Sequence, residues 1–374
     1  MQITGIEVFQ KDLPYPGVYK LSGGREFTSF KTTIVCLKTD TGLLGWGESC
    51  PFGGTYIEGH PAGVLAAIIE LSPNLLGLDP RDPSTVYAKM DSVLAGQAAA
   101  KSAIDIAVWD LAGKAEGAPV YELIGGLMCD NVPSISSISS DSPEKMLNSV
   151  RRHSDLGFTH HSIKIGAALN AGGPSMEAKR LTTVLRHSQP DDFFLVDANG
   201  SLTLDQAKQL FALLPENLNF VLEAPCATWG ETLLLRDFCP YPIMLDELAQ
   251  TDGDVGLAIQ LEACDGINLK LGKQGGISRC VTQRALCASS GLTMSIQDTW
   301  GAEISLSAIL QVAASTPGSM LSGALDTRPL VKTSLGELSN DVDATLGRLQ
   351  PPQLPGIGFE PNPALVGEPI IYFN

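Results

Sequence analysis

The fold is decided by four short apolar runs that each end in a charged residue: FFLVD (193–197), FVLE (220–223), PIMLD (242–246) and GINLK (266–270). The end residues Asp197, Glu223, Asp246 and Lys270 are 26, 23 and 24 residues apart. One strand, one helix and two loops fill such an interval, which is the repeating unit of a (β/α)8 barrel. A residue at the C-terminal end of a barrel strand points into the shared mouth, so the spacing predicts that these side chains converge there.

Three acids at neighbouring strand ends would repel one another and raise each other's pKa. A hard divalent cation relieves that repulsion, and a ligand set made only of oxygen atoms favours Mg2+ or Mn2+. An acid at a strand end can instead cap the following helix, but three in successive units are hard to explain in that way. We therefore predict a metal site at Asp197, Glu223 and Asp246, with Lys270 placed beside it as a base.

Two lysines lie inside apolar strands, Lys164 in SIKIGA and Lys270 in INLKLG. Burial of an unpaired ammonium costs on the order of several kcal/mol, so each needs a partner or a lowered pKa. Snorkelling at a strand end is the alternative for each. Because the two lysines flank the three acids, we interpret them as a functional pair. By contrast, His160 and His161 are expected in a surface loop, and residues 273–276 in a turn that enters a helix.

The composition excludes several classes of partner. Among 374 residues, 25 Lys and Arg stand against 41 Asp and Glu, a net charge of −16, so nucleic acid and anionic membranes are poor partners.

The start, MQITGIEVFQ, lacks the pattern of a signal peptide, and no apolar run approaches the roughly 18 residues of a membrane span. The eight cysteines form no CxxC pair and are expected to be small buried hydrophobes in a cytoplasmic protein.

The secondary-structure pattern changes once along the chain. Residues 1 to about 50 alternate like a small antiparallel sheet, and residues 62–127 have helical periodicity. Two glycine-bearing stretches, KLSGGREFTSF (20–30) and CPFGGTYIEGHPAG (50–63), are expected to be mobile loops that close over a site. Later residues repeat apolar run, turn and amphipathic helix. We predict strands near 133–137, 162–166, 193–197, 220–223, 243–246, 266–271, 293–297 and 320–324, and helices that include 143–155 after a Ser142 cap, 204–214, 277–290 and 304–314.

These patterns predict an α/β protein with a (β/α)8-type barrel and an N-terminal α+β capping domain. We place the capping domain at residues 1–127 and the barrel at 128–328. Residues 329–374 are rich in Pro and Gly and end in the strand-like PIIYFN, which is expected to return to the capping domain.

In its order of charged residues, Lys164, Asp197, Glu223, Asp246-Glu247 and Lys270 followed by KLGKQGGIS, the chain resembles the enolase superfamily, in its muconate-lactonizing subgroup. The resemblance covers nearly the whole chain, including GWGE at 45–48. It implies a modified (β/α)7β barrel, Mg2+ bound by the three acids, and catalytic lysines on opposite faces of the substrate. The resemblance also implies a homo-oligomer, from dimer to octamer.

Two departures from common patterns of the superfamily bear on the chemistry. The usual Lys-x-Lys motif on the second strand is Ser162-Ile163-Lys164 here, so only the catalytic lysine is carried over. The seventh strand, TMSIQD (293–298), has no histidine, which excludes the His/Asp base of mandelate racemase-like members. The remaining lysine base fits a reaction that removes a proton next to a carboxylate bound to Mg2+.

The resemblance extends to subgroup members that act on proline derivatives, such as hydroxyproline-betaine 2-epimerases and cis-3-hydroxy-L-proline dehydratases. It rests on CPFGGTYIEGHPAG and on SIQDTWGAEI (295–304). Betaine binders need an aromatic box, for which the chain offers Tyr56 and Trp300. However, Asp326 in GALDTRP stands where an aromatic residue would complete the box, and with Asp298 it suits a secondary ammonium. The expected substrate is therefore a free imino acid.

The expected reaction is dehydration of cis-3-hydroxy-L-proline to Δ1-pyrroline-2-carboxylate, with competing 2-epimerisation. The C2 hydrogen and the hydroxyl lie on opposite ring faces, so Lys270 is expected to remove the proton and Lys164 to protonate the departing hydroxyl. One alternative is an epimerase of proline betaine, hydroxyproline betaine or another amino acid derivative. Another is a barrel that binds an amino acid without catalysis.

Overall fold

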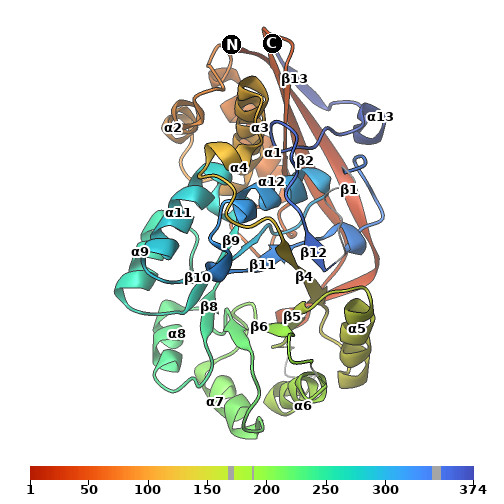
Figure 1. The fold of residues 1–374 in the computed structure, drawn as a ribbon, viewed down its shortest axis with the longest axis vertical. Helices are drawn as coiled ribbons and strands as arrows, with labels where there is room; N and C mark the ends of the chain where they lie inside the picture. Colours follow the sequence, from red (N-terminus) through yellow and green to blue (C-terminus); the bar gives the residue numbers. More distant parts are fainter. Residues whose placement is uncertain (167–171, 188, 339–346) are drawn as a thin grey trace.

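The computed structural model describes residues 1–166, 172–187, 189–338 and 347–374. Eight parallel strands form a barrel that closes through the pairing of the first strand with the last, Ser134 with Ala324 (Figure 1). The predicted barrel is therefore confirmed. Its strands are β4 (Val132–Ile138), β5 (His160–Lys164), β6 (Phe193–Asp197), β7 (Val221–Glu223), β8 (Ile243–Leu245), β9 (Gly266–Lys270), β10 (Thr293–Gln297) and β11 (Leu321–Leu325). A short strand, β12 (Arg348–Leu349), pairs antiparallel with β4.

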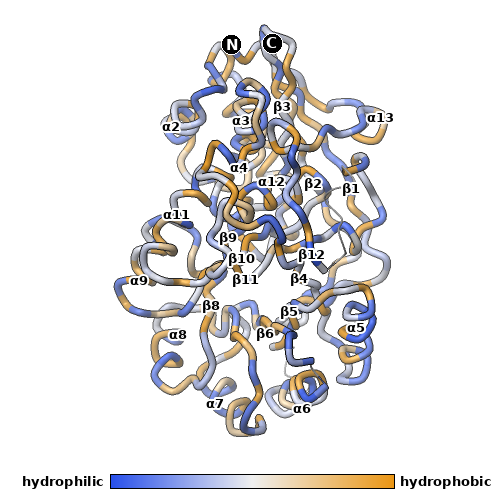
Figure 2. Tube along the Cα trace, in the orientation of Figure 1, coloured by the Kyte–Doolittle hydropathy of each residue, from blue (hydrophilic) through white to orange (hydrophobic). Residues whose placement is uncertain are grey.

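Helices follow the first seven barrel strands, as in a (β/α)7β barrel, whereas β11 leads into a 3-10 turn at Arg328–Leu330. Blue and orange stretches alternate along outer helices such as α7 and α8, as expected when one helix face packs on the strands (Figure 2). None of the helices in the described ranges is both long and apolar enough to cross a membrane. The barrel helices are α5 (Pro143–Asp155), α6 (Gly173–Leu185), α7 (Leu204–Leu213), α8 (Trp229–Arg236), α9 (Asp252–Gln260), α10 (Leu271–Gln274), α11 (Ile277–Ser289) and α12 (Glu303–Ala314).

A second, antiparallel sheet has the strand order β13-β1-β2-β3. The C-terminal strand β13 pairs with β1 through Ile6 and Phe373, so the two ends of the chain lie side by side (Figure 1). The predicted strand in PIIYFN is thus present, while the domain boundaries remain a proposal. The elements outside the barrel are β1 (Ile3–Leu21), β2 (Arg25–Thr39), β3 (Leu44–Ser49), α1 (Pro61–Leu71), α2 (Pro83–Val93), α3 (Ala98–Glu116), α4 (Val120–Leu123), α13 (Pro363–Val366) and β13 (Ile371–Phe373).

Two local predictions were wrong. Residues 20–30 belong mostly to a long hairpin of β1 and β2, and only Ser22–Gly24 forms a turn. The glycines serve that turn, and the residues after it pair with β1, as Phe27 does with Tyr19. His160 and His161 lie within β5, and His161 is fully buried, where Ser136 bonds its Nδ1 and Phe194 stacks on its ring.

The capping sheet meets α3 through the glycines of GWGE. A Cβ atom at Gly47 would lie 1.8 Å from the carbonyl oxygen of Ala103 and 2.8 Å from the nitrogen of Ala107. These are backbone atoms of a buried helix, so they cannot turn away as a side chain would. The alternation of β3 directs Trp46 and Glu48 to the opposite face. Gly47 therefore lets α3 approach the sheet closely.

Gly47→Ala is expected to lower the unfolding free energy by about 3 kcal/mol or more, because the added methyl group forces β3 and α3 apart. Urea denaturation followed by circular dichroism measures this loss. The matched control is Gly256→Ala on α9, where a Cβ meets nothing within 4 Å and alanine favours the helix. Equal midpoints for Gly47→Ala and the wild type would contradict the packing argument.

Candidate active site

The predicted acids and lysines lie at the C-terminal ends of consecutive barrel strands. In the strand register Lys164 is opposite Asp197, and Asp197 is opposite Glu223. Asp246 directly follows β8, and Lys270 is the last residue of β9. Each of the five is at most 8% exposed. The structure therefore places at one end of the barrel the four side chains predicted from the spacing and Lys164, which was predicted from its apolar strand.

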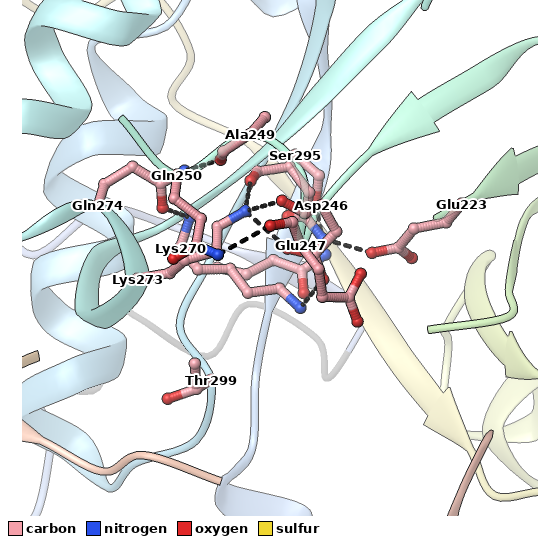
Figure 3. A network of polar contacts seen from close by, with 12 residues as sticks. Glu223, Asp246, Glu247, Ala249, Gln250, Lys270, Lys273, Gln274, Ser295 and Thr299 are labelled. Atoms are coloured by element: carbon pink, nitrogen blue, oxygen red, sulfur yellow. Dashed lines mark hydrogen bonds and ion pairs between the residues drawn. The ribbon is translucent and has the colours of Figure 1, made fainter. Parts of the chain in front are cut away.

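Asp246 is the most heavily bonded of the acids (Figure 3). Lys270 Nζ donates to its Oδ2 at 2.6 Å, and Tyr56 Oη donates to the same oxygen at 2.6 Å. Lys273 Nζ donates to Oδ1 at 2.8 Å and to the Asp246 carbonyl at 2.6 Å. The prediction that residues 273–276 only form a turn thus missed Lys273. The signal was available, because Lys273, like Lys270, is a lysine in a mostly apolar stretch.

Two asparagines that the sequence pattern does not mark bond the other acids. Lys164 Nζ and Asn199 Nδ2 both donate to Asp197 Oδ2, the latter at 2.9 Å. Asn268 Nδ2 donates to Glu223 Oε1 at 2.6 Å. Asn residues at such positions carry no distinctive sequence pattern, because only the folded barrel brings them to the carboxylates.

The charges in the site are strongly coupled. Burial raises the pKa of Glu223 to about 8, and repulsion from Asp197 adds to the effect. Burial would lower the pKa of Lys164, but the Asp197 carboxylate outweighs it and raises the pKa above the usual range. Burial would also lower the pKa of Lys270, but the Asp246 carboxylate has the larger effect and raises it. Both lysines are therefore ammonium ions in this arrangement.

The oxygen atoms of this site suit a hard cation. In the described part of the chain no three acidic, histidine or cysteine side chains surround one metal position, and lysine and asparagine side chains bond the carboxylates of the site. However, three buried oxygens beside them have no hydrogen-bond donor: Glu247 Oε2, Asn199 Oδ1 and Asn268 Oδ1. Such a surplus of oxygen acceptors fits Mg2+ or Mn2+. Burial and the Asp246 charge also raise the pKa of Glu247 to about 7.

A small buried cavity of about 30 Å3 lies against both lysines. A cavity of this volume has room for only a few water molecules. The lining residues must therefore move before a ring amino acid can enter. Tyr56, one of the lining residues, belongs to the irregular segment between β3 and α1. The lining residues are Tyr19, Leu21, Phe52, Tyr56, Ser137, Ser162, Lys164, Lys270, Gln297, Asp298, Thr299, Trp300 and Leu325.

Two of the predicted substrate-binding residues, Asp298 and Trp300, line this cavity and carry polar atoms without a hydrogen-bond partner. Asp298 accepts bonds from Gly272 N at 2.9 Å and Thr299 N at 2.6 Å through Oδ1, while its buried Oδ2 has no donor. Burial raises the pKa of Asp298 to about 7. Trp300 Nε1 is likewise buried without an acceptor, within an aromatic cluster that includes Phe30.

Asp326 does not share this environment. Its carboxylate accepts bonds from Arg328 Nε at 2.9 Å and Arg328 Nη2 at 2.6 Å, and it is absent from the cavity lining. The arginine only two residues later neutralises the charge that was expected to bind a substrate ammonium. Of the two predicted carboxylates, Asp298 alone lines the cavity, and its Oδ2 has no hydrogen-bond donor.

Both halves of the chain match known families. Residues 145–365 match the family Enolase C-terminal domain-like. Residues 25–125 match the family Mandelate racemase/muconate lactonizing enzyme, N-terminal domain. The two matches together cover the capping elements from β2 to α4 and most of the barrel.

Individual relatives cover the whole chain. A cis-3-hydroxy-L-proline dehydratase from Roseibium aggregatum is 35% identical, with 100% of both chains covered. An N-succinyl-L-Arg/Lys racemase from Bacillus cereus is 28% identical over 97% of this chain and 96% of its own. A crystal structure with magnesium, of a candidate mandelate racemase/muconate lactonizing enzyme from Roseovarius nubinhibens, is 46% identical with a TM-score of 0.97 and 100% of both chains covered.

Proposed function

We propose that this chain, which belongs to the mandelate racemase/muconate lactonizing enzyme family of the enolase superfamily, is a hydro-lyase that dehydrates cis-3-hydroxy-L-proline. The observation that carries the proposal is the pair Lys164 and Lys270, which end β5 and β9 and border one buried cavity beside three acids. The 35% identity to a dehydratase of this substrate supports it over the full length.

Each lysine has one proton to move. Neutral Lys270 takes the C2 proton, the electron pair forms the C2–C3 double bond, and the C3–O bond breaks. The Lys164 ammonium gives its proton to the departing hydroxyl, which leaves as water. The enamine then tautomerises to Δ1-pyrroline-2-carboxylate. The protons are balanced when Lys270 returns one to solvent and Lys164 regains one.

The acids Asp197, Glu223 and Asp246 are the proposed ligands of Mg2+, with Mn2+ as a substitute. When bound, the ion would stabilise negative charge on the substrate carboxylate and offset the acid charge that holds Lys270 protonated. Lys273 keeps its contacts with the Asp246 carbonyl and the Asn268 carbonyl, so it fixes the end of β8 against β9.

The ring nitrogen is assigned to Asp298. Its free Oδ2 accepts a hydrogen bond from a secondary ammonium, which a betaine nitrogen cannot donate. Tyr56 and Trp300 supply aromatic walls. The substrate is a small imino acid, and no nucleic acid or membrane partner is proposed. A reducing, cytoplasmic location agrees with eight cysteines that are all free. Assembly into a homo-oligomer is proposed from the family alone.

A second reaction follows from the same residues. If Lys164 returns its proton to C2 rather than to the hydroxyl, the product is the 2-epimer, so some epimerisation competes with dehydration. The 28% identity to an amino acid derivative racemase keeps a dedicated epimerase as the second candidate.

Proton NMR in D2O with a library of proline derivatives tests the function. The library contains cis- and trans-3-hydroxy-L-proline, cis- and trans-4-hydroxyproline, their betaines and N-acylamino acids. We expect cis-3-hydroxy-L-proline to give the ring product, with its C2 deuterated epimer as a minor product. If the C2 proton exchanges but no compound in the library loses water, the enzyme is an epimerase. No exchange at all with Mg2+ present would contradict both assignments.

A further inference from the structure

The helices of the barrel begin in two different ways. Four of them have their own N-cap, in which a side-chain oxygen accepts from the first turn of the same helix. These caps are Ser142 of α5, Thr203 of α7, Thr228 of α8 and Thr251 of α9. The other four, α6, α10, α11 and α12, have no side-chain cap in their own sequence. Two of these four receive a carboxylate from outside the barrel: α11, which begins after Gly276, and α12, which begins after Ala302.

Glu48 of the capping sheet occupies the start of α12. Its carboxylate accepts from Ala302 N at 3.0 and 3.1 Å, and from Ser305 N at 3.0 Å and Ser305 Oγ at 2.9 Å. Thr32 Oγ1 on the neighbouring strand adds a bond of 2.9 Å. Glu48 is fully buried. Burial raises its pKa, while these donors favour the charged form.

Asp105 of α3 occupies the start of α11 in the same manner. Ser278 N donates to its Oδ2 at 2.9 Å, and Ser278 Oγ donates to Oδ1 at 2.6 Å. Gly276, at φ +108°, packs directly on this carboxylate, and a Cβ there would lie 2.4 Å from Oδ2. Trp109, one turn further along α3, also donates to Ser278 Oγ, at 2.9 Å. Both helices are thus capped from the capping domain.

The loops in front of these two helices carry parts of the candidate site. Residues 298–302 precede α12 and include Asp298 and Trp300, which line the cavity. Residues 271–276 form the loop that precedes α11; this loop contains the short helix α10 and includes Lys273, which bonds Asp246. The two loops are joined, because Gly272 N donates to Asp298 Oδ1. Each loop is therefore anchored at one end by a strand and at the other by a helix that the capping domain holds.

We infer that Glu48 and Asp105 are positioning residues, which fix from the capping domain the two loops that place Asp298, Trp300 and Lys273. A buried carboxylate at a helix N-terminus is held by both the N–H donors and the helix dipole, so it fixes the helix end closely. The capping domain then acts on the chemistry through its rigid sheet and α3, in addition to the segment around Tyr56. The kinetic part of this inference rests on the proposed function.

The test compares Glu48→Gln and Asp105→Asn, which keep shape but remove charge, with Thr203→Ala. The control removes the exposed local cap of α7, whose Thr203 Oγ1 accepts from Gln206 N at 3.3 Å. Hydrogen–deuterium exchange followed by mass spectrometry reports on the helix ends without any need for activity. We expect at least about tenfold faster exchange at 302–305 in Glu48→Gln and at 277–280 in Asp105→Asn, and no change there in Thr203→Ala.

Steady-state dehydration of cis-3-hydroxy-L-proline separates positioning from loss of stability. For Glu48→Gln we expect KM to rise roughly ten- to a hundredfold with kcat little changed, because the loop at 298–302 contacts the substrate. For Asp105→Asn we expect kcat to fall roughly tenfold, because the loop at 271–276 orders Lys273 and the end of β9. Thr203→Ala should keep both constants at a temperature where all the variants are folded.

The outcomes are decisive in each direction. Faster exchange with wild-type kinetics would mean that the loops keep their position without the caps, and the inference fails. Altered kinetics with wild-type exchange would also overturn it. If Glu48→Gln does not fold, Ser305→Ala replaces it, because that change removes one donor to Glu48. A wild-type protein inactive on this substrate refutes the proposed function, while the exchange data still decide whether the carboxylates hold the helix ends.

Discussion

Lys270→Ala is expected to lose both C2 proton exchange and dehydration of the L-substrate, because no other base is assigned to that face. Lys164→Ala should behave differently. With Lys270 intact, C2 exchange with retention should survive, while 2-epimerisation and most dehydration disappear for want of an acid on the far face. We expect dehydration to fall by roughly two to four powers of ten, the usual contribution of one general acid or base.

NMR in D2O follows the C2 proton and the ring product separately for each variant. Lys179→Ala on α6 is the matched control, since that lysine is exposed and lies on the outside of the barrel. Normal dehydration by Lys164→Ala would refute the two-face assignment. So would continued C2 exchange of the L-isomer by Lys270→Ala.

Asp246→Asn is expected to abolish activity, with a loss of at least about a thousandfold, because the proposed metal site loses one of three carboxylates. The protein should still fold, but with a lower unfolding free energy, since Lys270 and Lys273 lose the charge that both of them bond. Circular dichroism and a thermal melt check the fold. Asp205→Asn, an exposed acid on α7, is the matched control.

Chelator treatment provides the complementary measurement for the metal. The wild-type protein should lose activity with excess chelator and regain it with Mg2+, and added Mg2+ should raise the melting temperature of the wild type but not of Asp246→Asn. Full activity in excess chelator would contradict the metal assignment for Asp197, Glu223 and Asp246.

The barrel could be predicted because its repeating unit places charged residues at similar intervals along the sequence. A charged residue after an apolar run, repeated at a constant interval, reports both the strand and its end, so Asp197, Glu223 and Lys270 could be placed before the fold was known. Burial supplied the second signal, since Lys164 inside an apolar strand has to have a partner, and Asp197 is that partner in the structure.

The prediction for Asp326 rests on its position at the end of the eighth strand, where an aromatic residue would complete a box, and it overlooks Arg328, which binds this carboxylate. Contacts between distant segments leave no signal in the sequence. His161 is expected at the surface from the sequence alone, because its burial depends on Phe194 of the next strand. Glu48 and Asp105 show the same limit, since a helix capped by another part of the chain has no cap in its own sequence.

The pairing of β13 with β1 constrains the order in which the molecule assembles. Ile6 and Phe373 pair although the whole barrel lies between them in the sequence. In the unfolded chain, closing a loop of that length costs conformational entropy that a three-residue strand cannot offset. The barrel, which occupies an uninterrupted stretch from β4 to β11, shortens that loop once it has formed. We therefore expect β13 to dock late during folding, and its hydrogen bonds to open before those of the barrel when the protein unfolds.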